Sequence, residues 1–427
     1  MMTAEADQRR AIVRKIFLII FIVLLLPAQI TSSEKDLKKS ALELFKMGNY
    51  SSAVDRLREA ERVNSDDPEI YYYLGYFTHY LCYDSVPLAG FDLDMSEQVL
   101  TYLERAVELD PDYGNAYYFI GAECGARGRM ELMNGNTEGA REEFRRGRAL
   151  GGYPDWLLEF GRNILKSCSR GAILFLGGDA DTNPIEYLQL VERYRTDVTA
   201  IPVALMSRPW FIKLVKKGVE DALPPVPISW SNYQIMNMHN YKWKANLVRA
   251  VISEEVRAEY GIEKPVFSWE LKPDISDGLI SAGTAAIADV IISNGFSRDI
   301  YFSLSCGGIS GLDVYMQLCG MAMKLVPFET SGTGFEVDTE SARKVLLEPE
   351  NFSDLPGVED TGMPRISGIL TNYPAALLRL CGYHLRRGEK EKGAEIFELI
   401  DRTGMKEYIR IGNLESHLEM YRKMTAE

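Results

Sequence analysis

Two closely spaced aspartates are the residues whose types and spacing could most readily do chemistry. Asp179 and Asp181 form a D-x-D pair in a glycine-containing segment, and carboxylate oxygens are preferred ligands of divalent cations. The candidate ligand-binding residues are Gly178, Asp179, Asp181, Thr182 and Asn183. The segment also has a structural explanation, because Asn183, Pro184 and Glu186 supply a helix N-cap, a first-turn proline and a first-turn acid. Both interpretations stay open, and any metal is unknown because the pair lacks a third ligand.

Other catalytic patterns are absent from the sequence. There is no G-x-S-x-G motif, and the run Ser305-Cys306-Gly307-Gly308 has no legible histidine or acid partner. Gly307-Gly308 matches neither a phosphate-binding loop nor a dinucleotide fingerprint. No C-x-x-C pair occurs, and the four histidines are not at metal-ligand spacing. We therefore expect no cofactor, and the sequence leaves enzymatic activity open while favouring a protein without it.

A cluster of tyrosines is the second set of candidate functional residues. Five tyrosines fall between residues 71 and 80, and they cannot all face one apolar stripe of a helix. Exposed aromatic side chains favour protein interfaces, so we predict that partner binding involves Tyr71, Tyr72, Tyr76 and Tyr80. The alternative is that these rings cover an insertion that follows Cys82.

The tyrosines belong to a repetitive helical region at residues 34–168. Small and apolar residues recur there in one phase, namely Ala53, Leu57, Ala60, Leu74, Gly75, Leu103, Ala106, Pro111, Ile120, Gly121, Ala140 and Phe144. This pattern resembles tetratricopeptide repeats, in which helix pairs of about 34 residues carry small residues at the helix crossings. Such arrays bind peptides or partner helices, so the resemblance implies protein partners.

The aspartates belong to a different kind of structure, predicted at residues 169–328. Short apolar runs at 172–176 and 198–206 read as strands, with a loop at 177–183 and helices at 184–195 and 209–217. Further on we expect a helix at 278–294, a strand at 300–304 and a helix at 311–325. This order predicts an open, mostly parallel α/β sheet, and the aspartates then follow the first strand, where such sheets bind ligands.

The two ends of the chain complete the expected organisation. Residues 329–368, rich in Gly, Ser, Glu and Pro, read as a linker, and residues 369–427 as a C-terminal tetratricopeptide-like helical pair. The fold class is therefore α plus α/β, with helical repeats, a central sheet and C-terminal helices. Cys306 and Cys319 could form a disulfide in an oxidising compartment, although buried cysteines are more often unpaired.

Residues 1–33 have the pattern of an export signal. Arg9, Arg10, Arg14 and Lys15 precede an apolar run at 16–26, which Pro27 ends. The segment is either a cleaved signal peptide or an N-terminal membrane anchor formed by a transmembrane helix. Both place the chain in the periplasm or cell envelope, with a membrane contact if the segment is uncleaved.

The charge balance excludes one class of partner. The 427 residues contain 48 Lys and Arg against 61 Asp and Glu, which gives a net charge of −13. Proteins that bind nucleic acids concentrate positive charge, so we expect no nucleic-acid partner.

Residues 172–217 also resemble a family. The segment is similar to the soluble C-terminal region of bacterial multi-pass membrane proteins related to protein O-mannosyltransferases, catalogued as a domain of unknown function. The matching residues are Gly178, Asp179, Asp181, Thr182, Pro184, Tyr187, Leu188, Gln189, Val191, Glu192, Arg195, Thr196, Asp197 and Val198. Ala180 replaces the family's Asn, and weaker similarity extends over residues 170–405. Because the multi-pass catalytic part has no counterpart here, the resemblance implies a shared soluble module without glycosyltransferase activity.

These observations lead to two functional hypotheses. The first is an exported envelope scaffold whose repeats dock protein partners, accessory to a membrane glycosyltransferase system. The alternative is a sugar or sugar-phosphate binding module or enzyme that uses the Asp179/Asp181 loop with a divalent cation. Arg195 and Asp197 could form a ligand clamp, but we favour a structural role, because turns between a helix and a strand often use such charges.

Overall fold

The computed structural model describes residues 34–84, 91–307, 311–334, 336–357 and 359–426. The predicted export segment at 1–33 lies outside the described residues. The chain divides into two compact units, one up to Glu123 and one from Cys124 onward.

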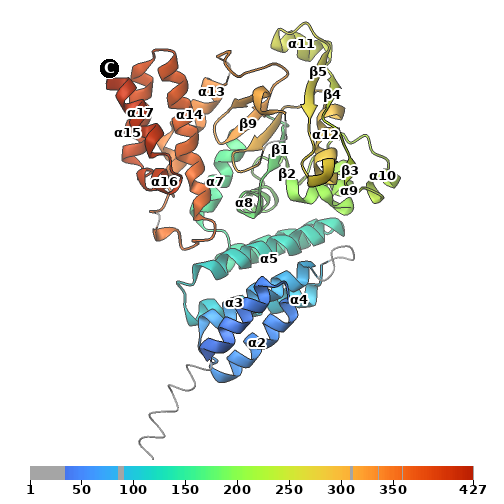
Figure 1. Cartoon of the computed structure of the whole chain (residues 1–427), viewed down its shortest axis with the longest axis vertical. Coiled ribbons are helices and arrows are strands. Elements are labelled where there is room, and N and C mark those ends of the chain that lie inside the picture. Colours follow the sequence, from blue (N-terminus) through green and yellow to red (C-terminus); the bar gives the residue numbers. More distant parts are fainter. Residues whose placement is uncertain (1–33, 85–90, 308–310, 335, 358, 427) are drawn as a thin grey trace, which may run out of the picture. The chain divides into compact units, whose positions relative to one another are not determined.

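The first unit is built from antiparallel helices, as the repeat pattern predicts. A helix at 34–46 is followed by α2 (Tyr50–Val63), α3 (Pro68–Asp84), α4 (Leu93–Leu109) and the first half of α5 (Gly114–Met133), as Figure 1 shows. Side chains that accept backbone N–H groups start two of them, Asn49 for α2 and Asp92 for α4. Small residues let the helices approach, since a Cβ atom on Gly75 of α3 would lie 2.6 Å from the Leu103 side chain of α4.

The second unit contains a five-stranded mixed sheet. Its strand order is β2 (Thr199–Pro202), β1 (Ile173–Leu176), β7 (Ile300–Ser303), β9 (Ala322–Leu325) and β8 (Met316–Leu318). The first three strands are parallel, with Ile173 opposite both Thr199 and Ile300, whereas β9 is antiparallel to β7 and β8. The α plus α/β class is confirmed, and the sheet is parallel in one half only.

Helices cover the parallel strands. α8 (Asp179–Leu190) joins β1 to β2, and α9 (Pro209–Lys217) and α12 (Ala282–Asn294) lie between β2 and β7 in the chain. Phe175 and Phe302 share one apolar core with Phe211 of α9 and Ile287 of α12. Because strand side chains alternate, Leu174 and Leu176 face the opposite side of the sheet.

The remaining elements of this region are two helices before β1 and several short elements between α9 and α12. The two helices are α6 (Thr137–Ala149) and α7 (Asp155–Lys166). Between α9 and α12 lie the short helices α10 (Asn232–Met236) and α11 (Glu254–Tyr260). The same region contains two antiparallel pairs, β3 (Tyr241–Lys242) with β6 (Leu279–Ile280) and β4 (Asn246–Val251) with β5 (Val266–Leu271).

Two sequence-based element predictions are wrong. The helix expected at 311–325 is a β-hairpin of β8 and β9, because Gly311 and Gly320 adopt φ values of +87° and +102° that interrupt a helix. The loop expected at 177–183 is largely the start of α8, whose first turn contains Asp179 and Asp181. Acidic residues stabilise a helix N-terminus, so the helix begins five residues before Pro184.

The C-terminal part of the second unit is helical. The segment 329–368, expected to be a linker, contains α13 (Thr339–Leu346) and three 3₁₀ turns, and Val337 forms a bridge to Leu318 of β8. It is followed by α14 (Asn372–Arg386), α15 (Lys390–Arg402), α16 (Lys406–Ile411) and α17 (Glu415–Ala426), with α14 in contact with α15 and α17 (Figure 1). The domain boundaries drawn from the sequence stay predictions.

The cysteines are all buried thiols. The structure contains no disulfide between Cys306 and Cys319.

Candidate functional site

The carboxyl edge of the parallel strands is the place where this architecture would hold a ligand. β1, β2 and β7 end at Leu176, Pro202 and Ser303, and the connections that follow β1 and β2 lie on opposite faces of the sheet. Ligands of open α/β sheets bind at this edge, where the connections diverge.

Asp181 lies at this edge but is turned into the protein. Its Oδ2 atom accepts hydrogen bonds from Ser303 Oγ at 2.5 Å, from Ser305 Oγ and from the Gly177 N–H at 3.1 Å. The residue is only 1% exposed, and its Oδ1 atom has no hydrogen-bond partner among the described residues. Burial raises the pKa of this carboxyl, while the two serine hydroxyls oppose that rise. Asp181 therefore ties the segment after β1 to the segment after β7.

The other four predicted ligand-binding residues separate into two pairs. Gly178 and Asp179 are exposed at the start of α8, whereas Thr182 and Asn183 are buried. Asn183 accepts a hydrogen bond of 3.0 Å from Arg129, so it contributes to packing. In the part of the chain that the structure describes, no group of three His, Cys, Asp or Glu side chains could hold a metal ion. Ligand binding by these five residues stays a prediction.

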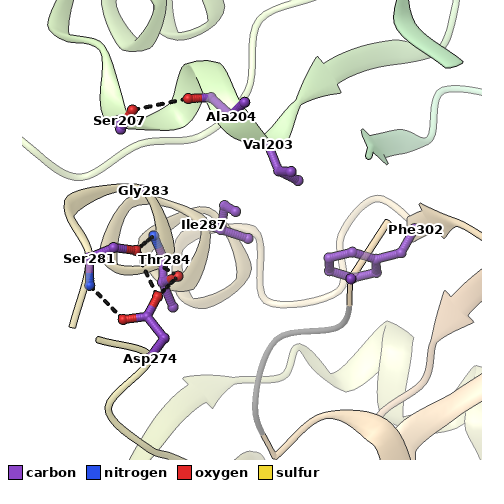
Figure 2. Close-up of a pocket in the computed structure, with 10 residues that line it drawn as sticks. Val203, Ala204, Ser207, Asp274, Ser281, Gly283, Thr284, Ile287 and Phe302 are labelled. Atoms are coloured by element: carbon purple, nitrogen blue, oxygen red, sulfur yellow. Dashed lines mark hydrogen bonds between the residues drawn. The ribbon is translucent and has the colours of Figure 1, made fainter. Parts of the chain in front are cut away.

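A cleft of about 340 Å³ opens at the same edge, on the α12 side of the sheet (Figure 2). Its lining comes from three separate segments and comprises Val203, Ala204, Ser207, Asp274, Ser281, Gly283, Thr284, Ile287, Phe302 and Gly307. Asp274 accepts hydrogen bonds from the Ser281 N–H and hydroxyl, both at 2.7 Å, and from the Thr284 hydroxyl at 2.5 Å. Burial alone would raise the pKa of Asp274, but these hydrogen bonds outweigh burial and lower it.

The sequence does not predict this cleft, because residues 229–269, which precede Asp274, show no clear helical or strand period. The sequence offers one local pattern here, Ser281-Ala-Gly-Thr284. In the structure Ser281 caps α12 by accepting a hydrogen bond from the Thr284 N–H. That pattern predicts a helix start, but only the tertiary structure brings Asp274 to it.

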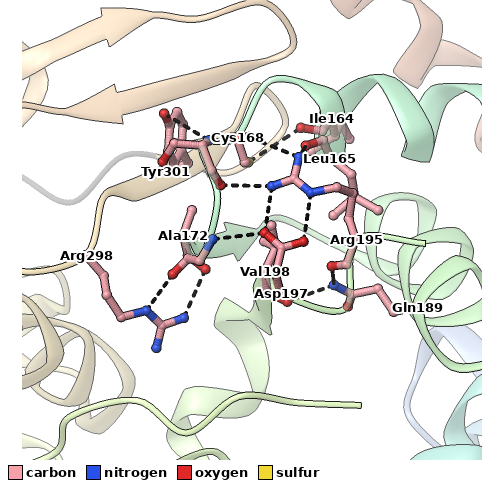
Figure 3. Close-up of polar contacts among 12 residues, drawn as sticks. Ile164, Leu165, Cys168, Ala172, Gln189, Arg195, Asp197, Val198, Arg298 and Tyr301 are labelled. Carbon is pink, nitrogen blue, oxygen red and sulfur yellow. Dashed lines mark hydrogen bonds and ion pairs between the residues drawn. The ribbon is translucent and has the colours of Figure 1, made fainter. Parts of the chain in front are cut away.

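Arg195 and Asp197 lie near the amino ends of β1 and β2 (Figure 3). The cleft lies at the other edge, where these strands end. The Arg195 guanidinium donates hydrogen bonds of 2.7–3.0 Å to the carbonyl oxygens of Leu165, Cys168 and Ser169. It also pairs with both oxygens of Asp197, which accepts the Gly171 N–H as well. These contacts support the structural interpretation over a ligand clamp.

Arg298 also stabilises the edge formed by the amino ends of the strands. Its guanidinium donates hydrogen bonds to the carbonyl oxygens of Gly171 and Ala172 and to the Thr199 hydroxyl, at 2.6–3.1 Å. Arg195, Asp197 and Arg298 therefore stabilise the amino edge of the sheet.

The repeat tyrosines form an aromatic cluster that joins three helices of the first unit. Tyr76 has its ring centroid 4.6 Å from that of Phe119 on α5 and 5.1 Å from that of Phe45. The ring centroid of Tyr80 lies 5.2 Å from that of Phe45, and the ring centroid of Tyr72 lies 5.9 Å from that of Tyr76.

The four predicted partner-binding tyrosines differ in exposure. Tyr71 and Tyr72 are buried, with 8% and 5% exposed, whereas Tyr76 and Tyr80 are half-buried. Because α3 packs between α2 and α4, two of its faces are covered, which explains why fewer tyrosines reach the surface than the sequence suggested. Partner binding by these tyrosines stays a prediction.

A buried acid lies next to the half-buried rings. Glu123 is fully buried, and its Oε2 atom lies 2.6 Å from Nδ1 of His79, whose ring contacts Phe119 and Tyr80. Its Oε1 atom has no hydrogen-bond partner within the described residues. The sequence from 34 to 123 contains eight Lys and Arg against eighteen Asp and Glu, a net charge of −10.

Comparisons with known proteins agree with both parts of this structure. Residues 41–79 match the family described as TPR repeat, and residues 157–266 match the family described as TMEM260-associated domain 2. The chain thus combines helical repeats of the tetratricopeptide kind with an α/β module similar to that domain, which confirms the resemblance seen in the sequence. Proteins of the repeat class generally bind other proteins.

Parts of the chain are similar to a curated relative and to solved structures. The mouse protein named Protein O-mannosyl-transferase TMEM260 is 27% identical over 97 residues, which cover 20% of this chain and 14% of that protein. The chain thus spans a small part of that relative. An O-GlcNAc transferase from Thermobaculum terrenum matches with a TM-score of 0.22 and 17% identity, over 40% of this chain and 37% of that chain.

Among the helices of the described residues, each is too short or too polar to serve as a membrane span. The predicted N-terminal anchor falls outside that part of the chain.

Proposed function

We propose that this chain is an exported interaction protein of the cell envelope, whose repeats dock a basic segment of a partner protein. The observation that carries the proposal is the cluster of half-buried aromatic rings on a helical-repeat unit of strongly negative charge. Aromatic residues are enriched at protein interfaces, and repeat arrays present such surfaces to peptides and helices.

The chemistry of the repeat unit selects the kind of partner. A repeat unit whose residues 34–123 carry a net charge of −10 attracts a basic segment and repels an acidic one. Tyr76 and Tyr80 offer ring faces that can hold the cations or apolar stems of arginine and lysine.

We assign the partner to a membrane glycosyltransferase system, in which the chain acts as an accessory protein. The support is the similarity of residues 157–266 to TMEM260-associated domain 2 and the match to a protein named as an O-mannosyl-transferase. The predicted export segment at 1–33 would bring the chain to the membrane where such an enzyme works.

The test is crosslinking and affinity capture from native membranes with the full-length chain. We expect a multi-pass glycosyltransferase to be recovered and to be lost with the double variant Tyr76→Ala/Tyr80→Ala, because truncation of central aromatic anchors typically costs about 2 kcal/mol or more each. Raising the ionic strength should also weaken capture, since the Debye length shortens from about 10 Å at 0.1 M to about 3 Å at 1 M.

The matched control is Tyr233→Ala, because Tyr233 lies in the second unit and is 78% exposed. It should capture the partner as the unchanged protein does, and circular dichroism should show that the double variant retains its helices. Equal capture by a folded double variant, or a captured partner whose contact segment is acidic, would contradict the proposal.

The alternative use of the Asp179/Asp181 loop gains no specific support from the geometry. The Oδ2 atom of Asp181 already accepts three hydrogen bonds from the protein, which leaves Asp179 as the exposed carboxylate of the pair. A cation site there would need both carboxylates as ligands. Its direct test is whether a divalent cation raises the melting temperature of the protein, as binding to the folded state would.

A further inference from the structure

The cleft beside α12 has the location of a ligand site that is independent of the Asp179/Asp181 loop. Its walls come from residues 203–207 after β2, residues 274–287 at the start of α12, and residues 302–307 at the end of β7. These segments are distant in sequence and meet at the carboxyl edge of the sheet, where ligands of open α/β sheets bind. The volume of about 340 Å³ falls at the small end of the roughly 300–1,000 Å³ range of small-molecule sites.

One wall of the cleft is polar and held in place. Asp274 is exposed, and the hydrogen bonds from Ser281 and Thr284 fix its carboxylate beside the first turn of α12 (Figure 2). The hydroxyl of Ser207 lies in the lining from the other side and donates a 3.0 Å hydrogen bond to the Ala204 carbonyl oxygen. A carboxylate accepts up to four hydrogen bonds, so Asp274 can still accept from a ligand hydroxyl.

The rest of the lining is apolar. Phe302, Ile287 and Val203 contribute side chains to it, and Figure 2 shows them between β7, α12 and the end of β2. A ligand that fits both walls must therefore carry hydroxyl groups on one side and C–H groups on another.

The charges of the cleft exclude the competing ligand classes. None of the ten described lining residues is Lys, Arg or His, and Asp274 would repel a phosphate or a carboxylate. A divalent cation needs several oxygen ligands, and the lining supplies one carboxylate. An organic ammonium ion is typically held in a cage of aromatic rings, and Phe302 is the only aromatic residue among the lining residues that the structure describes.

From these walls we infer that the cleft binds a neutral sugar of monosaccharide size, with Asp274 accepting hydrogen bonds from its hydroxyl groups. Ser207 and Thr284 supply further hydroxyl contacts. The apolar C–H face of the sugar ring packs on Phe302 and Ile287.

The test uses the full-length chain and saturation-transfer NMR with single probes. The neutral probes are glucose, mannose, galactose and N-acetylglucosamine, and the charged probes are glucose 6-phosphate and choline. We expect at least one neutral sugar to bind with a dissociation constant on the order of 1 mM, about −4 kcal/mol. Asp274→Asn should weaken binding about tenfold or more, because a hydrogen bond to a charged group is replaced by one to a neutral amide.

Two further variants make the test decisive. Ser207→Trp places a bulky ring into the cleft from an exposed position and should abolish binding even if Asp274→Asn folds poorly. The matched control is Asp277→Asn, because Asp277 is exposed and close in sequence but does not line the cleft, and it should bind as the unchanged protein does.

Three results would overturn the inference. The first is that no neutral sugar shows a saturation-transfer signal. The second is that folded Asp274→Asn and Ser207→Trp variants bind sugar as tightly as the unchanged protein. The third is that glucose 6-phosphate or choline binds more tightly than every neutral sugar. The variant Tyr76→Ala/Tyr80→Ala should keep sugar binding, so the outcome does not depend on the docking proposal.

Discussion

At the scale of single residues, Arg195 is a charged motif residue whose guanidinium forms its hydrogen bonds with other groups of the same chain. Its guanidinium donates hydrogen bonds to three carbonyl oxygens, one in the last turn of α7 and two between α7 and β1, and pairs with Asp197 before β2. Arg195→Ala would leave these half-buried acceptors and the Asp197 carboxylate without their donor. We expect the free energy of unfolding of the full chain to fall by roughly 3 kcal/mol in denaturant titrations.

The matched control for that substitution is Arg193→Ala. Arg193 makes one exposed hydrogen bond, to the carbonyl oxygen of Asp221, so we expect a loss below about 1 kcal/mol. Equal losses in the two variants would contradict a structural role specific to Arg195.

The Asp197 carboxyl should also give the protein a measurable pH dependence. Hydrogen bonds from Arg195 lower the pKa of Asp197 to about 2, against burial, and the Gly171 N–H adds to the lowering. Because the folded protein favours the ionised form, this contribution is fully present above the ordinary pKa of 3.8 and is lost as the pH falls through about 2. Asp197→Asn should flatten the fall in unfolding free energy between about pH 4 and pH 2, and an unchanged slope would contradict this account.

At the scale of elements, the contact between the segments after β1 and β7 depends on one glycine. A Cβ atom at Gly177 would lie 2.4 Å from the Ser305 carbonyl oxygen, and a backbone atom cannot rotate away. Gly177→Ala should therefore lower the free energy of unfolding by about 1–3 kcal/mol, measured by denaturant titration.

The neighbouring glycine provides the control. A Cβ atom at Gly178 would meet nothing within 4 Å, so Gly178→Ala should cost less than about 1 kcal/mol, the difference between Gly and Ala at an N-cap. If Gly178→Ala proves the more damaging change, the close approach of Gly177 to Ser305 is not what holds the two segments together.

The prediction of helices and strands from the sequence was correct where the start, stop and period signals agreed, and wrong where the period was ambiguous. The helix expected at 209–217 is α9, because Pro209 starts it and Gly218 ends it at a φ of +74°. The run 311–325 is apolar without a decisive period, and its pairing partner, β7, lies earlier in the chain. A strand in that position is therefore specified by a contact that local periodicity does not reveal.

At the scale of the whole molecule, the protein should be insensitive to oxidation and reduction. All six cysteines are buried thiols, and burial raises the pKa values of Cys306, Cys319 and Cys381 to about 12. Thiolate is the reactive form, so we expect slow labelling by a thiol reagent in the native protein and six reactive thiols in denaturant. A reductant should leave the melting temperature unchanged.

Fast native labelling, or fewer than six thiols in the unreduced denatured chain, would contradict that expectation.

The sequence by itself determined the two kinds of structure, the helical repeats and the βαβ unit, because helical and strand periods are local and the small residues at helix crossings recur in phase. It also placed Asp181 after the first strand. Only the tertiary structure decided that Asp181 faces Ser303 and Ser305, that Tyr71 and Tyr72 are buried, and that Asp274 meets the start of α12 in a cleft. These are contacts between segments distant in the chain, and their positions follow from how the sheet and helices pack, which no short pattern encodes.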